Sequence, residues 1–291
     1  MKNLILPIIL LAMPIICIAQ EEDDLFGDLL DNKEFVLTTF ETTRLINAHT
    51  TEIVGKRSLD FRINHRFGDV NGGLQQLYGL DNAGSIELAF DYAVNDKFQF
   101  GIGRINLGKF MNVYGKYRIL RQTTNNSNPI SITGIAKGTG TIIEADDDRF
   151  DKFTNRLIYT TQLQFAKKLS KKLSLQVGPV WSHFNLVDSA QYNHDNLGIL
   201  FLGRYKLFKR AAITWEYNYR INTLDDRTID NSIYRNSIGI GFEIETGGHV
   251  FQTFFTNSKS AEESQAYFRT SSDPLKGEWR LGFNISRVFS L

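Results

Sequence analysis

Cysteine is almost absent from this chain: a single residue, Cys17, occurs among 291. It lies within an apolar run from Leu4 to Ile18 that follows Lys2, and Ala19 comes directly after the run. One positive charge, a short apolar stretch and a small residue at its end are typical of a cleavable secretory signal peptide. We therefore expect residues 1–19 to be removed on export, which leaves a mature chain that no disulfide stabilises.

Long hydrophobic runs and an excess of charge of one sign are also lacking. Downstream of the N-terminal segment the longest apolar run is 197–203, far short of the roughly 18 residues of a membrane-spanning helix. The 33 Lys and Arg are matched by 32 Asp and Glu, which argues against nucleic acid as a partner. These absences leave two classes, a soluble exported protein or a barrel that crosses a membrane with strands.

Alternation of apolar and polar residues is the dominant pattern that is present. In residues 59–67 one face is apolar apart from His65, whereas the other carries Asp60, Arg62, Asn64 and Arg66. The pattern recurs at 86–94, 98–103, 111–119, 157–165, 173–182, 213–220, 237–245 and 278–289, and less cleanly at 129–138, 195–207 and 249–257. It predicts about twelve strands of roughly 9–13 residues, close to the length of a tilted membrane strand and longer than most soluble strands.

Short and long connections alternate along the chain. Tight turns are expected at 95–96, 170–172, 208–210 and 246–248, with a slightly longer one at 122–128, and long polar loops at about 68–84, 139–153, 185–194, 222–233 and 258–276. Outer-membrane barrels have short turns on the periplasmic side and long loops outside. We therefore predict an all-β fold in which residues 57–291 form an antiparallel transmembrane β-barrel of about twelve strands, embedded in the lipid of the cell outer membrane.

In such a barrel the apolar face of each strand meets lipid and the polar face lines the lumen. The predicted lumen charge network comprises Asp60, Arg62, Arg66, Glu87, Asp91, Lys116, Arg118, Glu216, Arg220, Arg235, Glu243 and Arg280, and Arg204, Lys206, Glu245 and Glu278 are expected on the same face. Unpaired charges away from water are costly, so these groups either pair across the lumen or enclose a water-filled channel. Because both signs are well represented, we favour a narrow, largely salt-bridged lumen.

A set of short motifs resembles a known family. The segments are TTFETTRLINAHTTE (38–52), LDFRINHRFGDVNGG (59–73), LYGLDNA (77–83), FGIGR (100–104) and YGKYRILRQ (114–122). Together, and in this order, they resemble the DUF5777 family of Bacteroidetes outer-membrane β-barrel proteins. The resemblance implies a membrane barrel and a Gram-negative host, and it implies no activity.

The two ends of the predicted mature chain carry further signals. Residues 20–34 are strongly acidic and are interpreted as a periplasmic leader, either disordered or a docking peptide. Residues 35–56 are expected to form an extra strand pair or a plug within the lumen. At the other end Phe283, Ile285, Phe289 and Leu291 occupy alternate positions, which resembles the signal that the barrel-assembly machinery binds.

Catalytic and metal-binding motifs receive little support from the sequence. None of the five His residues forms an HExxH or His-x-His motif. The acidic stretch 144–151 lacks the spacing of an EF-hand. Ser182 and His183, like Asn64 and His65, do not have the spacing of the Ser-His-Asn arrangement of outer-membrane phospholipases, and no G-x-S-x-G elbow occurs.

We therefore expect no catalytic, cofactor-binding or metal-binding residues, and no enzyme. The function that the pattern favours is a non-enzymatic narrow channel or gated transporter for small or lipophilic solutes. The alternative is a closed structural barrel that binds an unidentified partner through its loops or its acidic leader. A lipid-modifying enzyme is the least favoured of the three.

Overall fold

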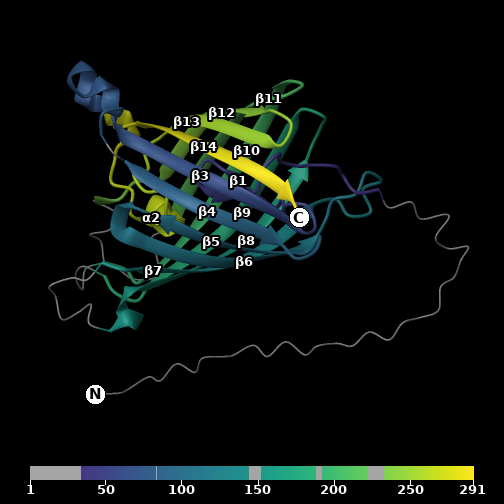
Figure 1. Cartoon of the computed structure of the whole chain (residues 1–291), viewed down its shortest axis with the longest axis horizontal. Coiled ribbons are helices and arrows are strands. Elements are labelled where there is room, and N and C mark those ends of the chain that lie inside the picture. Colours follow the sequence, from purple (N-terminus) through teal and green to yellow (C-terminus); the bar gives the residue numbers. More distant parts are fainter. Residues whose placement is uncertain (1–33, 83, 144–151, 188–191, 222–232) are drawn as a thin grey trace, which may run out of the picture. The chain divides into compact units, whose positions relative to one another are not determined.

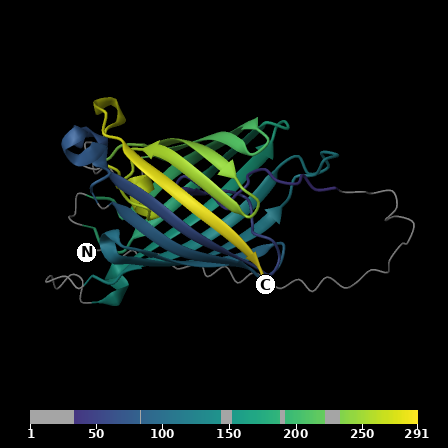
Figure 2. The same cartoon turned by 45° about the horizontal axis from the view of Figure 1, so that its top comes forward.

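Twelve antiparallel strands form a closed barrel in the computed structural model, which describes residues 34–82, 84–143, 152–187, 192–221 and 233–291 (Figure 1). The strands are β3 (Ser58–Asp69), β4 (Ser85–Ala93), β5 (Phe98–Ile105), β6 (Phe110–Leu120), β7 (Ser131–Thr141), β8 (Leu157–Lys168), β9 (Leu173–Phe184), β10 (Asp195–Phe208), β11 (Ala211–Ile221), β12 (Ser237–Glu245), β13 (His249–Thr256) and β14 (Arg280–Ser290). Each pairs with its sequence neighbours, and β14 pairs with β3 to close the ring (Figure 2). The predicted antiparallel barrel of about twelve strands is confirmed.

Smaller elements lie at the ends of the barrel and inside it. Strands β1 (Arg44–Leu45) and β2 (Ala48–His49) pair only with each other in the described sheets. Short helices occur in the connections: η1 (Val70–Gly79), η2 (Leu107–Lys109), η4 (Phe153–Arg156), α2 (Glu263–Phe268) and η5 (Pro274–Lys276). Among the described residues, none of the helices is both long enough and apolar enough to span a membrane.

The two ends of the barrel differ in the connections that they carry. The short-turn end holds tight turns such as 246–248, where Gly247 and Gly248 have φ of 52° and 106°, values that favour glycine. The long-loop end holds η1, α2 and η5. Because the number of strands is even, β3 begins and β14 ends at the short-turn end, where Figure 1 places the C-terminus.

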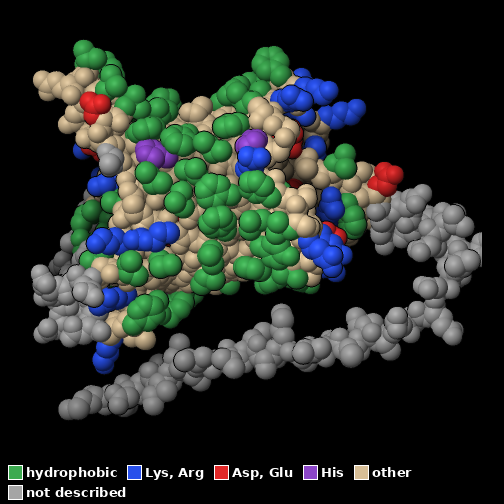
Figure 3. Space-filling model, viewed as in Figure 1, with side chains coloured by type: hydrophobic (Ala, Val, Ile, Leu, Met, Phe, Trp, Pro, Cys, Tyr) green, Lys and Arg blue, Asp and Glu red, His purple; other side chains and the backbone are tan. Residues whose placement is uncertain are grey.

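Period-2 alternation places each strand's apolar side chains on the outer surface of the barrel. On β4, Leu88 and Phe90 point outward and are 46% and 45% exposed, whereas Glu87, Ala89 and Asp91 are buried inside. Figure 3 shows apolar side chains spread over the wall on the face in view. This is the arrangement that a lipid environment requires of a barrel.

The core of the protein lies within the barrel, where two chain segments fill the lumen. The plug hairpin, residues 38–54, contains β1 and β2 and precedes the first barrel strand. The inward loop, residues 257–273, joins β13 to η5 and contains α2. Most of their residues are buried, and the plug hairpin lies in the region that the sequence assigned to a strand pair or a plug.

An apolar cluster forms where these segments contact strands β8, β9 and β10. It comprises Phe40, Leu45 and Ala48 of the plug hairpin, Ala266, Tyr267 and Phe268 of the inward loop, and Ile158, Ala166, Val180, Phe184, Leu200 and Leu202 of the wall. The alternation is less clean at 195–207 for this reason: Leu200 and Leu202 point inward and pack against apolar groups. Their burial removes apolar surface from water, which stabilises the filled lumen.

The predicted signal peptide (1–19) and nearly all of the predicted acidic leader (20–34) lie outside the described residues, as does the acidic stretch 144–151.

Candidate functional site

The tip of the plug hairpin is held by a carboxylate of the barrel wall. Glu216 on β11 accepts the backbone N–H groups of Asn47 and Ala48 at 2.8 and 2.9 Å, and its other oxygen accepts the Asn47 side-chain amide at 2.8 Å. The preceding residue, Ile46, has φ of 54°, an unfavourable conformation for a β-branched side chain. The contacts to Glu216 therefore fix a turn that the local sequence disfavours.

The carbonyl group at the same tip is bound by another part of the wall, strands β3 and β14. Ile46 O accepts hydrogen bonds from Arg66 on β3 and from Asn284 on β14, each at 2.8 Å. The Arg66 guanidinium also lies 4.5 Å from the ring centroid of Phe254, a cation–π contact. Arg66 is thus a wall cation whose partners are mainly plug atoms and a ring, and no carboxylate forms a salt bridge with it among the described residues.

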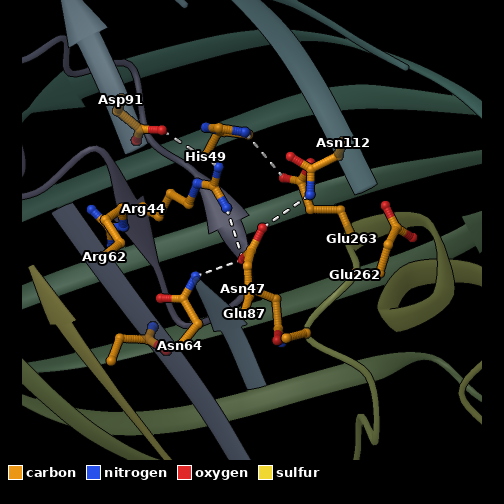
Figure 4. A network of polar contacts seen from close by, with 12 residues as sticks. Arg44, Asn47, His49, Arg62, Asn64, Glu87, Asp91, Asn112, Glu262 and Glu263 are labelled. Atoms are coloured by element: carbon orange, nitrogen blue, oxygen red, sulfur yellow. Dashed lines mark hydrogen bonds and ion pairs between the residues drawn. The ribbon is translucent and has the colours of Figure 1, made fainter. Parts of the chain in front are cut away.

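Arg44 forms the ionic centre of the plug hairpin (Figure 4). Its guanidinium lies 3.1 Å from Glu87 and 3.8 Å from Asp91, both on β4. The Glu87 carboxylate also accepts amide hydrogens of Asn64 and Asn112, at 2.7 and 3.0 Å. A buried carboxylate with a cation and two amide donors is well satisfied, and withdrawing Arg44 would remove its only salt-bridge partner among the described residues.

The base of the plug hairpin is bound by a lysine and a glutamine of the wall. The Lys116 ammonium on β6 donates to three plug carbonyls, those of Thr43, Thr50 and Glu52, at 2.9–3.1 Å. Gln176 on β9 accepts the N–H of Thr51 at 2.9 Å and donates to the carbonyl of the neighbouring His49 at 2.8 Å. Polar wall residues thus replace the strand pairing that the plug backbone lacks.

The inward loop is anchored by one lysine of the wall, on the strand next to β6. The Lys137 ammonium on β7 lies 3.2 Å from Glu262 and 3.1 Å from Glu263, and all three side chains are buried. Glu262 also accepts the hydroxyl of Thr139 at 3.1 Å, and Glu263 accepts the amide of Gln162 at 3.3 Å. Two carboxylates that share one ammonium hold α2 against β7 and β8.

The two inserted segments meet at His49 and Glu263. His49 Nε2 lies 3.6 Å from Glu263 Oε1, and the imidazole packs on the ring of Tyr114 at a centroid distance of 4.6 Å. His49 belongs to the plug, outside the membrane-spanning strands, and burial together with the nearby Arg44 holds the pKa of its imidazole well below the usual value. The contact is therefore between a neutral ring and a carboxylate at neutral pH.

The buried charges of the described residues balance. Seven are cationic, namely Arg44, Arg62, Arg66, Lys116, Lys137, Arg204 and Arg220, and seven are anionic, namely Asp60, Glu87, Asp91, Glu216, Glu243, Glu262 and Glu263. Three of these fourteen, Arg44, Glu262 and Glu263, belong to the inserted segments rather than to the wall. Equal numbers of opposite charges lower the cost of placing so many ionic groups in a filled lumen.

The residues of the predicted lumen charge network are not all placed alike. Nine of the twelve are buried in the barrel: Asp60, Arg62, Arg66, Glu87, Asp91, Lys116, Glu216, Arg220 and Glu243. Arg62 of this group lies 3.1 Å from Asp60 on the same strand, and Glu243 lies 2.7 Å from Arg204, which was expected on the same face.

The remaining three lie near the ends of the barrel. Arg118 pairs with Glu52 at 3.5 Å and Arg280 with Asp69 at 3.1 Å. Arg235 precedes β12 and lies 3.7 Å from Asp273, with its side chain 36% exposed. Hence Arg235 belongs to the connections at the long-loop end and not to the wall.

Sequence reasoning did not identify Arg44, Lys137, Glu262 and Glu263 as members of the network. Three of them lie in segments without strand periodicity, and Lys137 lies in the glycine-rich 129–138 segment. The adjacent acids and the following apolar residues of 261–268, AEESQAYF, are the one local signal for a short helix with a buried face.

The residue pairs considered for catalysis point to opposite faces of their strands. Ser182 is buried and its hydroxyl lies 2.8 Å from that of Thr160. His183, the next residue, lies on the other face with Nδ1 2.8 Å from Asp195. Asn64 and His65 are separated in the same way. Among the described residues, no group of three or more His, Cys, Asp and Glu side chains could hold a metal ion.

Comparison with known proteins gives matches at the level of family and fold. The solved structures similar to this chain include the NanC porin (8% identity, 80% of this chain and 99% of that chain, TM-score 0.49), the KdgM porin (10%, 80% and 99%, 0.48) and an outer membrane channel from Pseudomonas putida (15%, 82% and 98%, 0.47). At these identities and TM-scores the likeness concerns the fold alone. A search of curated proteins finds no significant match.

A family model described as a membrane bound beta barrel domain matches residues 40–289, which include most of the plug hairpin and all of the wall except the last residue of β14. The family resemblance expected from the short motifs is therefore confirmed, and this chain belongs to the DUF5777 family of membrane-bound β-barrel domains.

Proposed function

We propose that the protein is a non-enzymatic, gated channel of the outer membrane and that the structure represents its closed state. One observation carries the proposal: wall charges are satisfied by segments that are not part of the wall. Glu216, Lys116 and Lys137 find most of their partners in the plug hairpin or the inward loop. A purely structural barrel can fill its lumen with wall side chains that pair with one another.

The plug hairpin can leave without disrupting the barrel. Its two strands pair with each other and not with β3–β14 in the described sheets, and the β3–β14 pairing that closes the ring does not involve it. In the described part of the chain it is held by wall side chains that bind its backbone and side chains, and by the apolar cluster around Leu45 and Ala48. Its removal would cost those contacts and leave the ladder of backbone hydrogen bonds intact.

Displacement would expose a lining of mixed chemistry. Water can solvate the freed groups of Glu216 and Lys116, and because both signs are present the lining would not select strongly for ions of one charge. Leu200 and Leu202 would add an apolar stretch to it. Such a lining fits small solutes, including lipophilic ones, that pass without a chemical reaction.

A reversible lock on the plug hairpin tests the proposal. A Cβ placed at Gly239 on β12 would lie 3.0 Å from Cγ2 of Ile46, roughly the separation between a cysteine Cβ and the partner sulfur of a disulfide. We therefore expect Ile46→Cys with Gly239→Cys to form a disulfide, in a background in which Cys17→Ser removes the only other thiol.

Planar-bilayer recordings of this variant would compare the oxidised and reduced forms. We expect opening events in the unlocked protein and in a variant lacking residues 38–54, and their loss on oxidation of the cysteine pair. Opening that is equally frequent with the disulfide formed contradicts gating by the plug hairpin. Each single-cysteine variant is the matched control, because it carries the same packing change without the lock.

A closed scaffold is the second candidate, and the balanced buried charges and the continuous apolar cluster favour it. A closed scaffold would give bilayers without current for the wild type and for the variant without the plug hairpin.

For both candidate functions we propose that the barrel-assembly machinery inserts the protein through β14, whose Phe283, Ile285 and Phe289 share the outward face. We also propose that the host is a Gram-negative bacterium of the Bacteroidetes.

A further inference from the structure

We propose that the outer surface of the wall carries a binding site for one anionic phospholipid, at the short-turn end of strands β8 to β11. Short turns face the periplasm in outer-membrane barrels, so the lipid would come from the inner leaflet. The inference goes beyond the proposed channel function and does not depend on it, because the site lies on the outside of the wall and its occupation requires no movement of the plug hairpin.

An apolar groove of about 450 Å³ lies in this part of the wall. Its lining includes Leu175, Val177 and Phe201, which are 38%, 41% and 42% exposed, so the groove opens to the outside of the barrel. Lys167 and the buried amide residue Gln176 are the only polar residues of the described chain that line it. The volume lies within the range of small-molecule sites, and the lining fits a hydrocarbon chain.

A glycine in a row of larger side chains explains where the groove lies. Gly203 on β10 pairs with Leu175 on β9 and with Trp215 on β11. Leu175 pairs in turn with Lys167 on β8. A Cβ at Gly203 would lie 1.9 Å from Cζ2 of Trp215, so the indole packs directly on the glycine backbone, in space that any side chain would fill. The row therefore runs from an ammonium group to an aromatic ring with a depression between them.

Four lysines form a collar beside this groove. The lysine collar comprises Lys167 near the end of β8, Lys171 and Lys172 in the β8–β9 turn, and Lys209 in the β10–β11 turn. The backbone N–H of Lys206 donates to the carbonyl of Lys172 at 2.8 Å, which places the two turns side by side. Lys167 is half-buried along the groove and the other three are exposed. Several cations thus meet one apolar depression at the expected membrane surface.

Acids of the described chain do not balance the charge of the lysine collar. None of the four ammonium groups forms a salt bridge or a hydrogen bond with a described residue. The plug acids Glu41 and Glu52 pair instead with Arg204 and Arg118, each at 3.5 Å. The β12–β13 turn at the same end, residues 246–248, contains no Lys or Arg, so the positive charge is local to the edge of the groove.

An anionic phospholipid matches both parts of this site. Its acyl chain fits the apolar groove, and its phosphate lies at the membrane surface, where each basic residue strengthens the binding of an anionic lipid about fivefold. Lys167 can keep its methylene stem in the groove while its ammonium reaches the phosphate. A zwitterionic lipid brings its own cation and would leave the lysine collar without a counter-charge, and a free anion would not use the groove.

Quenching of Trp215 fluorescence by brominated lipids tests the site. The chain has three Trp, and Trp181→Phe with Trp279→Phe leaves Trp215, which lines the groove, as the only indole. This variant is refolded into phosphatidylcholine vesicles that contain a rising fraction of either brominated phosphatidylglycerol or brominated phosphatidylcholine. We expect half-maximal quenching at a fraction at least fivefold lower for the anionic lipid, with a smaller difference at high salt.

Charge variants separate a site from a general attraction to the surface. Lys167→Met keeps an unbranched side chain and removes the charge, so it should reduce the preference for the anionic lipid about fivefold, and Lys167→Arg should restore it. Lys97→Met is the matched control, because Lys97 is an exposed lysine of the β4–β5 turn at the same end and does not line the groove. Its preference should equal that of the parent.

Three results would overturn the inference: equal quenching by the two lipids, an unchanged preference in Lys167→Met, or an equal loss of preference in Lys97→Met. Inorganic phosphate supplies the fourth arm. If it displaces the brominated anionic lipid while sulfate at the same ionic strength does not, the site binds a free anion and the lipid proposal is wrong.

Discussion

The carboxylate of Glu216 and the backbone N–H of Asn47, 169 residues apart in the chain, are joined by a hydrogen bond of 2.8 Å inside the barrel. One wall side chain therefore accepts both backbone N–H groups at the tip of the plug hairpin, those of Asn47 and Ala48. The relation between the two residues shows how the lumen is closed: by polar side chains of the wall that bind backbone groups of an inserted segment.

Replacing this carboxylate should loosen the plug hairpin. Glu216→Ala removes three hydrogen bonds to a charged acceptor, each of which contributes about 1.5–3 kcal/mol. We expect trypsin to cleave after the buried Arg44 at least tenfold faster than in the wild type, because release of the plug hairpin exposes that bond. Glu245→Ala, at the end of β12 beside the tight turn, is the control and should leave the cleavage rate unchanged. Equal protection in both variants would contradict the role of Glu216.

Removing the lysine that anchors α2 should destabilise the inward loop. Lys137→Met leaves Glu262 and Glu263 buried without their ammonium partner, a situation that costs about 3–5 kcal/mol. We expect a lower midpoint of urea unfolding in phospholipid vesicles and more frequent opening in bilayers. Adding Glu262→Gln and Glu263→Gln to Lys137→Met should recover part of the loss, and a triple variant less stable than Lys137→Met alone would show that the three groups do not act as a unit.

The barrel wall was predictable because a strand has a period of two. Once Leu59 is assigned to the lipid side, Asp60 and Arg62 must point inward, and the structure follows this alternation through β3. The tight turns fixed the direction in which successive strands run. The polar side of a strand, however, gives no information on what it meets, so the identity of the partner of Glu87 could not be derived from β4.

The inserted segments were beyond the reach of periodicity because short irregular chains are positioned by tertiary contacts. Residues 258–276 have the composition of an exposed loop, yet Glu262 and Glu263 are buried inside the barrel, where both pair with Lys137. The inward orientation of the apolar wall residues Leu200 and Leu202 is likewise explained by the inserted segments, because Phe268 and Leu45 belong to the same apolar cluster. The candidate site is thus a property of the packed lumen and not of any single segment.

Acid should weaken the closed state through His49. Burial is the largest cause of the lowered pKa of this imidazole. Four nearby cations lower the pKa further, namely Arg44 of the plug hairpin, Lys116 of β6, Lys137 of β7 and Arg62 of β3. Glu263 of α2, 3.6 Å away, acts in the opposite direction. A released plug hairpin would hold His49 at its ordinary pKa of about 6.5. Below that pH the released state binds the extra proton, so the closed state loses stability as pH falls.

The loss between pH 7 and pH 5 can reach at most roughly 2 kcal/mol, since each unit below the ordinary pKa contributes no more than about 1.4 kcal/mol. Channel opening in bilayers should therefore increase over this range in the wild type. His49→Gln keeps a polar side chain of similar size that does not titrate, and its response to acid should be much smaller. An unchanged acid response in His49→Gln would assign the effect to other groups.

An outward-facing arginine tests which side of the wall meets lipid. Leu88 lies in the middle of β4 and is 46% exposed on the outer surface. In a bilayer Leu88→Arg should cost about 2–4 kcal/mol of unfolding free energy, because the charge is placed near the midplane of the hydrocarbon region. Leu275→Arg, at a position 96% exposed in the long-loop connections, meets water and should cost less than about 0.5 kcal/mol. Urea unfolding in phospholipid vesicles measures both, and an equal, small effect at the two positions would mean that the apolar face of β4 does not contact acyl chains.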